Sequence, residues 1–107
     1  MTEKASDSAR TGAYELLVAT HVFRVMSKYD TRVASAEELV SDADLRTRDL
    51  AVLGLGSLDW MALATALEQA TDRELPDRVL VDPQQRCIAG WAAALATAER
   101  IGTGGNS

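Results

Sequence analysis

The sequence predicts an all-α protein, a four-helix bundle with three main helices, one short helix and a long first loop. Two observations carry this prediction. Apolar residues recur at helical spacing in three long segments, and no segment shows the alternation expected of a strand. The 107 residues suit one domain with a modest core, and such a chain has little room for a deep catalytic cleft of its own.

The first main helix is expected over residues 13–29, which carry a wide apolar face at helical spacing. The residues of this face are Leu16, Val18, Ala19, Val22, Phe23, Val25, Met26 and Tyr29. Residues 30–56 are mixed in character, and we interpret them as a long connection. Because a structureless loop of this length is unusual in a compact domain, we expect a short helical turn in it, around residues 36–40 or 46–51.

The second main helix is expected over residues 58–71, with Ser57 as its N-cap and Asp59 in its first turn. Pro76 opens a short element over residues 76–81, since proline suits a first helical turn. The last helix is expected over residues 84–100. One of its faces is formed by Ile88, Trp91, Ala92 and Leu95.

The polar ends of the chain lie outside these elements. We therefore divide the chain into a disordered N-terminal tail over residues 1–11, a folded domain over residues 12–101 and a flexible tail over residues 102–107. The first ten residues lack the apolar core of a signal peptide, and no apolar run approaches membrane-spanning length. We expect a cytoplasmic protein.

Charge and composition exclude several functions. The net charge of −5 disfavours binding to nucleic acid or to anionic membranes, and it either suits docking onto basic patches or simply keeps the protein soluble. Cys87 is the only cysteine and His21 the only histidine. An internal disulfide, an ordinary zinc site and a self-contained Ser–His or Cys–His pair are therefore excluded.

The chemically informative segment surrounds Ser57, where a flexible glycine-containing loop meets a helix N-terminus. Unpaired N–H groups and a partial positive charge at such a terminus favour an attached phosphate, although most serines in this position are only caps. Three other motifs fail here. A hydrolase elbow requires glycine at positions 55 and 59, a dinucleotide fingerprint requires glycine at 59, and a P-loop requires a lysine that residues 54–61 lack.

Three segments in order resemble the acyl and peptidyl carrier protein family. The first resembles its L-G-x-D-S-L-D attachment motif and reads Leu53-Gly54-Leu55-Gly56-Ser57-Leu58-Asp59. The second resembles the E-I-P-D segment that opens the short third helix, and reads Glu74-Leu75-Pro76-Asp77. The third resembles the H-P-T-V-x-x-L-A start of the last helix, and reads Asp82-Pro83-Gln84-Gln85-Arg86-Cys87-Ile88-Ala89. The resemblance covers about residues 13–98.

This resemblance implies a four-helix carrier bundle that catalyses nothing itself. A phosphopantetheinyl transferase would transfer a 4'-phosphopantetheine arm from coenzyme A to the Ser57 hydroxyl. The thiol of the arm would carry an acyl or aminoacyl thioester, supplied by a loading enzyme and passed to a downstream synthase, transferase or modifying enzyme. We expect a free-standing monomer with transient contacts.

The sequence departs from the family pattern in two places. Gly56 stands where the family usually has aspartate, so the side chain that helps to orient the arm is missing. The helix after Ser57 is also poor in acidic residues on its outward positions. These positions are Leu58, Asp59, Met61, Ala62, Thr65, Glu68 and Gln69, and we expect partners to dock on all of them except Gln69. The second departure favours secondary-metabolite assembly, polyketide or nonribosomal peptide, over a housekeeping fatty-acid carrier.

Two alternatives to the carrier interpretation stay open. The first is a helical interaction module that has kept the bundle and lost the arm, an alternative that Gly56 supports. The second is a small enzyme with Ser57 as nucleophile, which lacks a base because His21 lies on another predicted helix.

Some single residues allow narrower hypotheses. Trp60 shares a face with Leu63, Ala64 and Leu67, so it is either plain core packing or it fills the cargo pocket and restricts the cargo to short or polar groups. We expect Cys87 and Trp91 to be buried and His21 to lie on the flank of the first helix. The charged residues before the motif, namely Arg46, Arg48 and Asp49, are candidates for contacting a partner or the phosphate of the arm.

Overall fold

The structure is a computed structural model that describes residues 2–29 and 35–98. Within these two segments the chain forms six helices and no strand, which confirms the all-α prediction. The helices are α1 (Thr2–Met26), α2 (Ala36–Ser41), α3 (Ala43–Thr47), α4 (Ser57–Thr71), α5 (Arg78–Val81) and α6 (Ile88–Thr97). The three main helices and the short one that we predicted correspond to α1, α4, α6 and α5, and two further short helices occupy the first connection.

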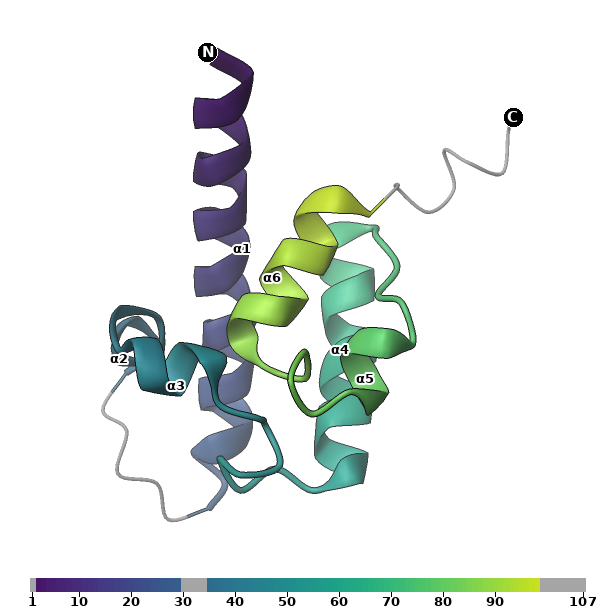
Figure 1. Ribbon diagram of the computed structural model, residues 1–107. Coiled ribbons are helices and arrows are strands. Elements are labelled where there is room, and N and C mark those ends of the chain that lie inside the picture. The colour runs from purple at the N-terminus through teal and green to yellow at the C-terminus, as the bar shows by residue number, and fades with distance from the viewer. Residues whose placement is uncertain (1, 30–34, 99–107) are drawn as a thin grey trace.

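Helix α1 packs against both α6 and α4, and in Figure 1 the ribbon of α6 is drawn between those of the other two long helices. Helices α4 and α6 run in the direction opposite to α1 (Figure 1). Helix α1 packs mainly against α6 and α2, and α5 lies across the outer side of α4 and α6. The loop before α4 and the C-terminal end of α1 therefore meet at one end of the bundle, shown at the bottom of Figure 1.

The core is built from the apolar faces that helical spacing predicts. Its largest member is Trp91, which is fully buried and whose indole Nε1 donates a 2.7 Å hydrogen bond to the carbonyl oxygen of Val79. This bond satisfies the only polar atom of the side chain and ties α6 to α5. The other fully buried large side chains are Val18, Val22, Leu39, Leu50, Leu67, Val79, Ile88 and Leu95.

Two short helices, α2 and α3, lie in the connection before α4, and α2 corresponds to the helical turn expected around residues 36–40. The Ser35 hydroxyl accepts a hydrogen bond from the backbone N–H of Glu38 and caps α2. Asp42 caps α3 in the same way through the N–H of Asp44. Of the alternative placement, around residues 46–51, the first two residues are the last of α3 and the others lie in a segment of bends and hydrogen-bonded turns.

The starts of α1 and α6 differ most from the predicted ones. Helix α1 already begins at Thr2, so residues 2–11, predicted as a tail, are helical; this segment contains neither proline nor glycine. Helix α6 begins at Ile88 and not near residue 84, because Asp82 holds residues 84–86 in turns and Cys87 is extended. The predicted tail over residues 102–107 lies outside the described residues.

Candidate functional site

The loop between α3 and α4, residues 48–56, leads into the serine that the sequence singles out. Two buried leucines anchor it, Leu50 and Leu55, and the N–H of Leu55 donates a 3.1 Å hydrogen bond to the carbonyl oxygen of Leu50. Between them, Gly54 has a φ of +105°, a backbone conformation that L-residues with a side chain rarely adopt. The glycine of the Leu-Gly pair is thus required by the shape of the loop.

Helix α4 begins one residue earlier than predicted. Gly56 is its N-cap and Ser57 is its first helical residue, so the expectation of Ser57 as N-cap is wrong. Glycine has no side chain to accept a first-turn N–H. The reverse hydrogen bond of a capping box is present, because Asp59 Oδ2 accepts a 3.1 Å hydrogen bond from the Gly56 N–H. Ser57 is exposed at the positive end of a helix of 15 residues.

Tyr29, which lies in the turn after α1, contacts this end of the molecule. Its hydroxyl donates a 2.9 Å hydrogen bond to the same oxygen of Asp59, and this bond to an anionic acceptor raises the pKa of Tyr29. Residues 29 and 59 are far apart in sequence, and the sequence offered no signal for the pair. The contact places the C-terminal end of α1 beside the first turn of α4.

The outward face of α4 is apolar next to Ser57. Leu58 is 82% exposed and Met61 is 53% exposed, and Ala62 and Thr65 are exposed further along the same helix. Glu68 differs from the other expected docking residues, because its carboxylate is half-buried and accepts a 2.8 Å hydrogen bond from the N–H of Leu75. The described contact of Glu68 therefore joins α4 to the α4–α5 loop.

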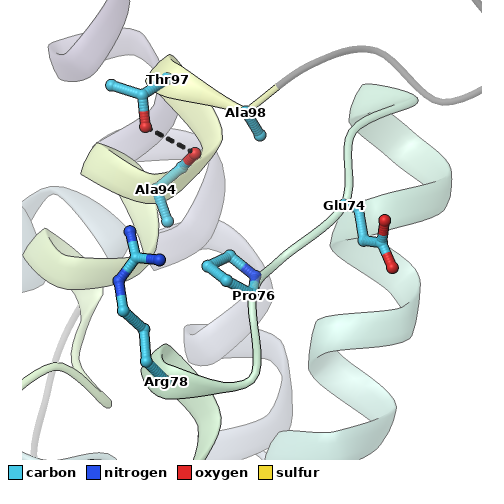
Figure 2. Close-up of a pocket in the computed structure, with 6 residues that line it drawn as sticks. All are labelled: Glu74, Pro76, Arg78, Ala94, Thr97 and Ala98. Carbon is cyan, nitrogen blue, oxygen red and sulfur yellow. Dashed lines mark hydrogen bonds between the residues drawn. The ribbon is translucent and has the colours of Figure 1, made fainter. Parts of the chain in front are cut away.

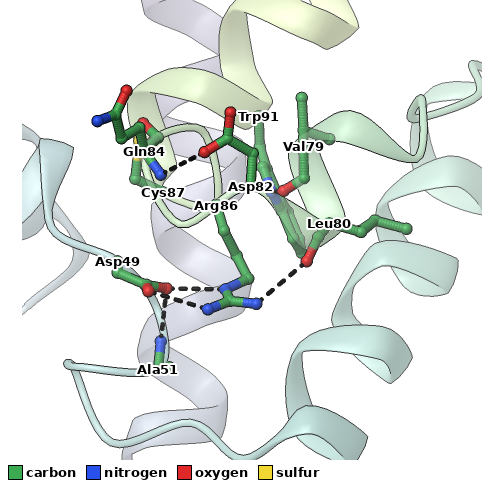
Figure 3. Close-up of polar contacts among 9 residues, drawn as sticks. All are labelled: Asp49, Ala51, Val79, Leu80, Asp82, Gln84, Arg86, Cys87 and Trp91. Atoms are coloured by element: carbon green, nitrogen blue, oxygen red, sulfur yellow. Dashed lines mark hydrogen bonds and ion pairs between the residues drawn. The ribbon is translucent and has the colours of Figure 1, made fainter.

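The Arg86 side chain contacts residues of several elements beside the loop between α3 and α4. Its guanidinium forms a bidentate pair with Asp49, with Nε–Oδ1 at 2.8 Å and Nη2–Oδ2 at 2.9 Å (Figure 3). This pair lowers the pKa of Asp49 and raises that of Arg86. The guanidinium also lies 4.9 Å from the ring centroid of Trp60, which is half-buried and not a deep core residue.

Most of the other residues that the sequence singled out make contacts within the protein. Arg46 donates to the carbonyl oxygen of Val40 and pairs with Glu15, whereas Arg48 is exposed. His21 is half-buried on the flank of α1, as predicted, with Nδ1 donating to the Leu17 carbonyl oxygen at 3.0 Å. Cys87 is buried, also as predicted, and its Sγ accepts a hydrogen bond from the N–H of Gly90 at the start of α6.

A groove lies at the opposite end of α4 from Ser57, between the α4–α5 loop and the end of α6 (Figure 2). Arg78 points towards Ala94 and Thr97, whereas Glu74 points away towards α4 (Figure 2). Because α4 has 15 residues, about 20 Å of helix separates this groove from the serine. We therefore do not include the groove in the candidate site.

Among residues 2–29 and 35–98, no group of three or more His, Cys, Asp or Glu side chains is placed to hold a metal ion. No helix in the same segments is long and apolar enough to cross a membrane.

The geometry defines a small helical bundle that presents an exposed serine at the start of a helix, beside exposed apolar side chains. A family model described as phosphopantetheine attachment site matches residues 31–95, more than half of the chain and including Ser57. The chain therefore belongs to the phosphopantetheine-binding carrier family, which includes acyl and peptidyl carrier proteins. Searches of curated proteins and of solved structures gave no match.

Membership of this family defines the general role of the chain. Its domain is the attachment site of a 4'-phosphopantetheine group, which supports a carrier role, and carrier domains of this family are not catalytic. The residues at the start of α4 fit such a group. A phosphodiester on Ser57 would lie at the helix N-terminus, where first-turn N–H groups and the helix dipole favour negative charge.

Proposed function

We propose that the chain carries an acyl or aminoacyl intermediate as a thioester on a 4'-phosphopantetheine arm attached to Ser57. The observation that carries the proposal is the position of this serine. It is exposed, it begins α4, and it lies within the segment matched by the attachment-site family. The arm supplies the thiol that bears the cargo, and the residues of the chain hold and present it.

The attachment chemistry requires an accessible hydroxyl and a place for the phosphate. The Ser57 oxygen would form a bond to the phosphorus that bears the pantetheine arm while the pyrophosphate bond of coenzyme A breaks. Adenosine 3',5'-bisphosphate would leave, and the hydroxyl proton would pass to a base. The described structure gives Ser57 no partner that acts as a base, because the His21 ring is bound to its own helix. The proton acceptor must then come from the transferase, which agrees with a carrier acted on by partner enzymes.

The surface around Ser57 supports docking of those partners. Leu58 and Met61 expose apolar surface next to the serine, and such exposed apolar side chains favour a protein interface. We propose that Leu58, Asp59, Met61, Ala62 and Thr65 form this surface. Glu68 is included only at its edge, because the Leu75 N–H already occupies its carboxylate. The partners would be a phosphopantetheinyl transferase, a loading enzyme and a downstream synthase, transferase or modifying enzyme.

We further propose a monomeric, free-standing, cytoplasmic carrier of polyketide or nonribosomal peptide assembly. The proposal is supported by the weak charge of the docking surface. Apart from Glu68 at the edge, Asp59 is the one acidic residue of this surface, and its carboxylate already accepts hydrogen bonds from Gly56 and Tyr29. Docking on this surface would therefore depend more on apolar contacts than on charge, which suits dedicated partners better than the general enzymes of fatty-acid synthesis.

Intact-protein mass spectrometry tests the attachment. The protein is incubated with coenzyme A and a broad-specificity phosphopantetheinyl transferase, beside a Ser57→Ala variant and a second carrier that proves the transferase active. We expect the mass of one phosphopantetheinyl group to be added to the parent protein and none to Ser57→Ala. Addition to Ser57→Ala would contradict the assigned position.

An unmodified parent protein would favour the second candidate, a helical interaction module without an arm. The observation behind this candidate is the N-cap, where Gly56 provides no side chain to orient a phosphate. Gly56→Asp would then be the next protein to test, because its Cβ meets no atom closer than 3.7 Å.

A further inference from the structure

We propose that Arg86 is a positioning residue for the attachment reaction, holding the loop and the first turn of α4 on both sides of Ser57. This inference rests on the proposed attachment at Ser57. Arg86 lies 29 positions after the serine, in the turn between α5 and α6, and no motif of the sequence assigns it a role. Its contacts are what connect it to the site.

The Arg86 side chain contacts the chain before and after Ser57. On the N-terminal side, the guanidinium binds both carboxylate oxygens of Asp49, and on the C-terminal side it lies 4.9 Å from the ring centroid of Trp60. Trp60 belongs to the first turn of α4. A third contact, at 3.3 Å, runs from Nη1 to the carbonyl oxygen of Leu80 in α5 (Figure 3).

The backbone of the same residue adds a further link. The N–H of Leu50 donates a 2.8 Å hydrogen bond to the carbonyl oxygen of Arg86, and Leu50 in turn accepts from the N–H of Leu55. Fixing residues 49 and 50 therefore fixes residue 55, which is two positions before Ser57. The segment between them is exposed at Ala51, Val52 and Gly54. Its N–H groups also depend on Asp49, whose carboxylate accepts a hydrogen bond from Ala51 and whose carbonyl oxygen accepts from Val52 and Leu53.

The environment of the pair makes it stronger than a surface ion pair. Both side chains are largely shielded, at 15% exposure for Arg86 and 16% for Asp49, and the bidentate geometry fixes orientation as well as distance. Lysine cannot reproduce this geometry, because it has a single ammonium group and no planar fork. The contacts thus select arginine.

The expected effect is on recognition and not on the chemical step. Without the contacts of Arg86 with Asp49 and Trp60, the loop before Ser57 would adopt the conformation that the transferase binds only part of the time. The apparent affinity of the transferase for the carrier would then fall by that fraction. For Arg86→Met we expect the KM of the transferase for the carrier to rise about three- to tenfold, with kcat within about twofold of the parent value. Arg86→Lys should fall between the two proteins.

The experiment measures transferase kinetics on the full chain, at a temperature where circular dichroism shows each variant fully folded. Arg78→Met is the control, since Arg78 is an exposed arginine beside the groove at the opposite end of α4 from Ser57, and its KM should not change. Asp49→Asn, a milder variant that keeps the shape of the side chain, should raise KM in the same direction. It keeps the proposal testable if Arg86→Met does not fold.

Hydrogen exchange of the Leu55 amide gives a second readout that does not depend on modification. We expect faster exchange at this amide in Arg86→Met and Arg86→Lys, with unchanged exchange at the Trp91 amide in the core. An unmodified parent protein would contradict the proposed attachment at Ser57, while the exchange data would still test whether Arg86 holds the loop in place. Folded Arg86 variants with parental KM and parental exchange at Leu55 would overturn the positioning role.

Discussion

The starts of α4 and α6 are alike in backbone and opposite in burial. Each helix follows a loop and has an extended N-cap residue, Gly56 with φ −77° and ψ 171° and Cys87 with φ −150° and ψ 168°. At α6 the cap side chain itself accepts the Gly90 N–H, and Ile88 is fully buried. At α4 the cap has no side chain, and both Ser57 and Leu58 are exposed.

The difference shows how one local geometry serves two purposes. At the start of α6, the first-turn residues are turned into the core, and the capping sulfur is buried with them, so this junction contributes to stability. At the start of α4, the hydroxyl and the positive helix end face solvent, where a partner enzyme can reach them. The two helix starts thus differ in burial and not in backbone conformation: the buried start of α6 contributes to stability, and the exposed start of α4 is accessible for chemistry.

The largest expected effect comes from Gly90→Ala at the buried junction. A Cβ on residue 90 would lie 2.2 Å from the carbonyl oxygen of Gln85, a backbone atom that cannot rotate away. We expect the free energy of unfolding to fall by about 2–3 kcal/mol, because the turn before α6 must shift. Chemical denaturation followed by circular dichroism measures this loss.

Gly12→Ala is the matched control, because Gly12 is exposed within α1 and a Cβ there meets nothing within 4 Å. Replacing a helical glycine by alanine at such a site is expected to stabilise the protein by about 0.5–1 kcal/mol. Equal effects of the two substitutions would contradict the steric explanation for Gly90.

Gly54→Ala is expected to have a smaller effect at the exposed junction, and for a different reason. A Cβ at residue 54 meets no atom within 4 Å, so the cost comes only from holding alanine at a φ of +105°. We expect a loss of about 1–2 kcal/mol and slower modification of Ser57, measured by denaturation and by transferase assay. A variant with parental stability would mean that the loop can relax to a negative φ.

The sequence was a good guide to whatever depends on local pattern. Helical spacing predicted the long helices, and glycine, proline and serine signals predicted α5 and the start of α4 to within two residues. The attachment motif was recognised because its residues are contiguous, so spacing alone carries the information. The buried state of Trp91 followed from its place on an apolar helix face, and that of Cys87 from the tendency of free cysteine to be buried.

Contacts between distant segments were not predicted. Arg86 and Asp49 are 37 positions apart, and Tyr29 and Asp59 are 30 apart, and neither pair has a sequence period that connects its members. Asp49 was instead interpreted as a possible contact for a partner. Trp60 was assigned to the core face from its spacing, but the Arg86 guanidinium covers its ring near the surface, which spacing cannot reveal.

Gly56→Asp would make the exposed junction more like the buried one by adding a side-chain cap. The backbone of residue 56 suits any residue, and the new carboxylate would accept first-turn N–H groups. Asp59 already lies close by and repels a second negative charge, so we expect stability to change by less than about 0.5 kcal/mol. Thermal unfolding measures the change, and a loss as large as that of Gly54→Ala would show that Gly56 is required for the shape of the loop.

The smallest expected effect is a shift in the ionisation of Tyr29, the residue that connects α1 to the exposed junction. Its hydroxyl donates to the Asp59 carboxylate, and ionisation would break that bond and place two negative charges together, so the pKa of Tyr29 lies above the ordinary value of about 10. A raised pKa in the folded state means that the bond contributes at lower pH and is lost as the pH rises through that pKa.

Ultraviolet titration of phenolate absorbance tests this contact in a Tyr14→Phe background, where Tyr29 is the only remaining tyrosine. Adding Asp59→Asn should move the Tyr29 titration to lower pH, because the amide keeps an acceptor but removes the charge. Identical titrations with and without Asp59→Asn would mean that Tyr29 and Asp59 are not in contact in solution. The exposed junction would then lose its link to the end of α1, and its contacts with Arg86 and the leucines of its loop would remain.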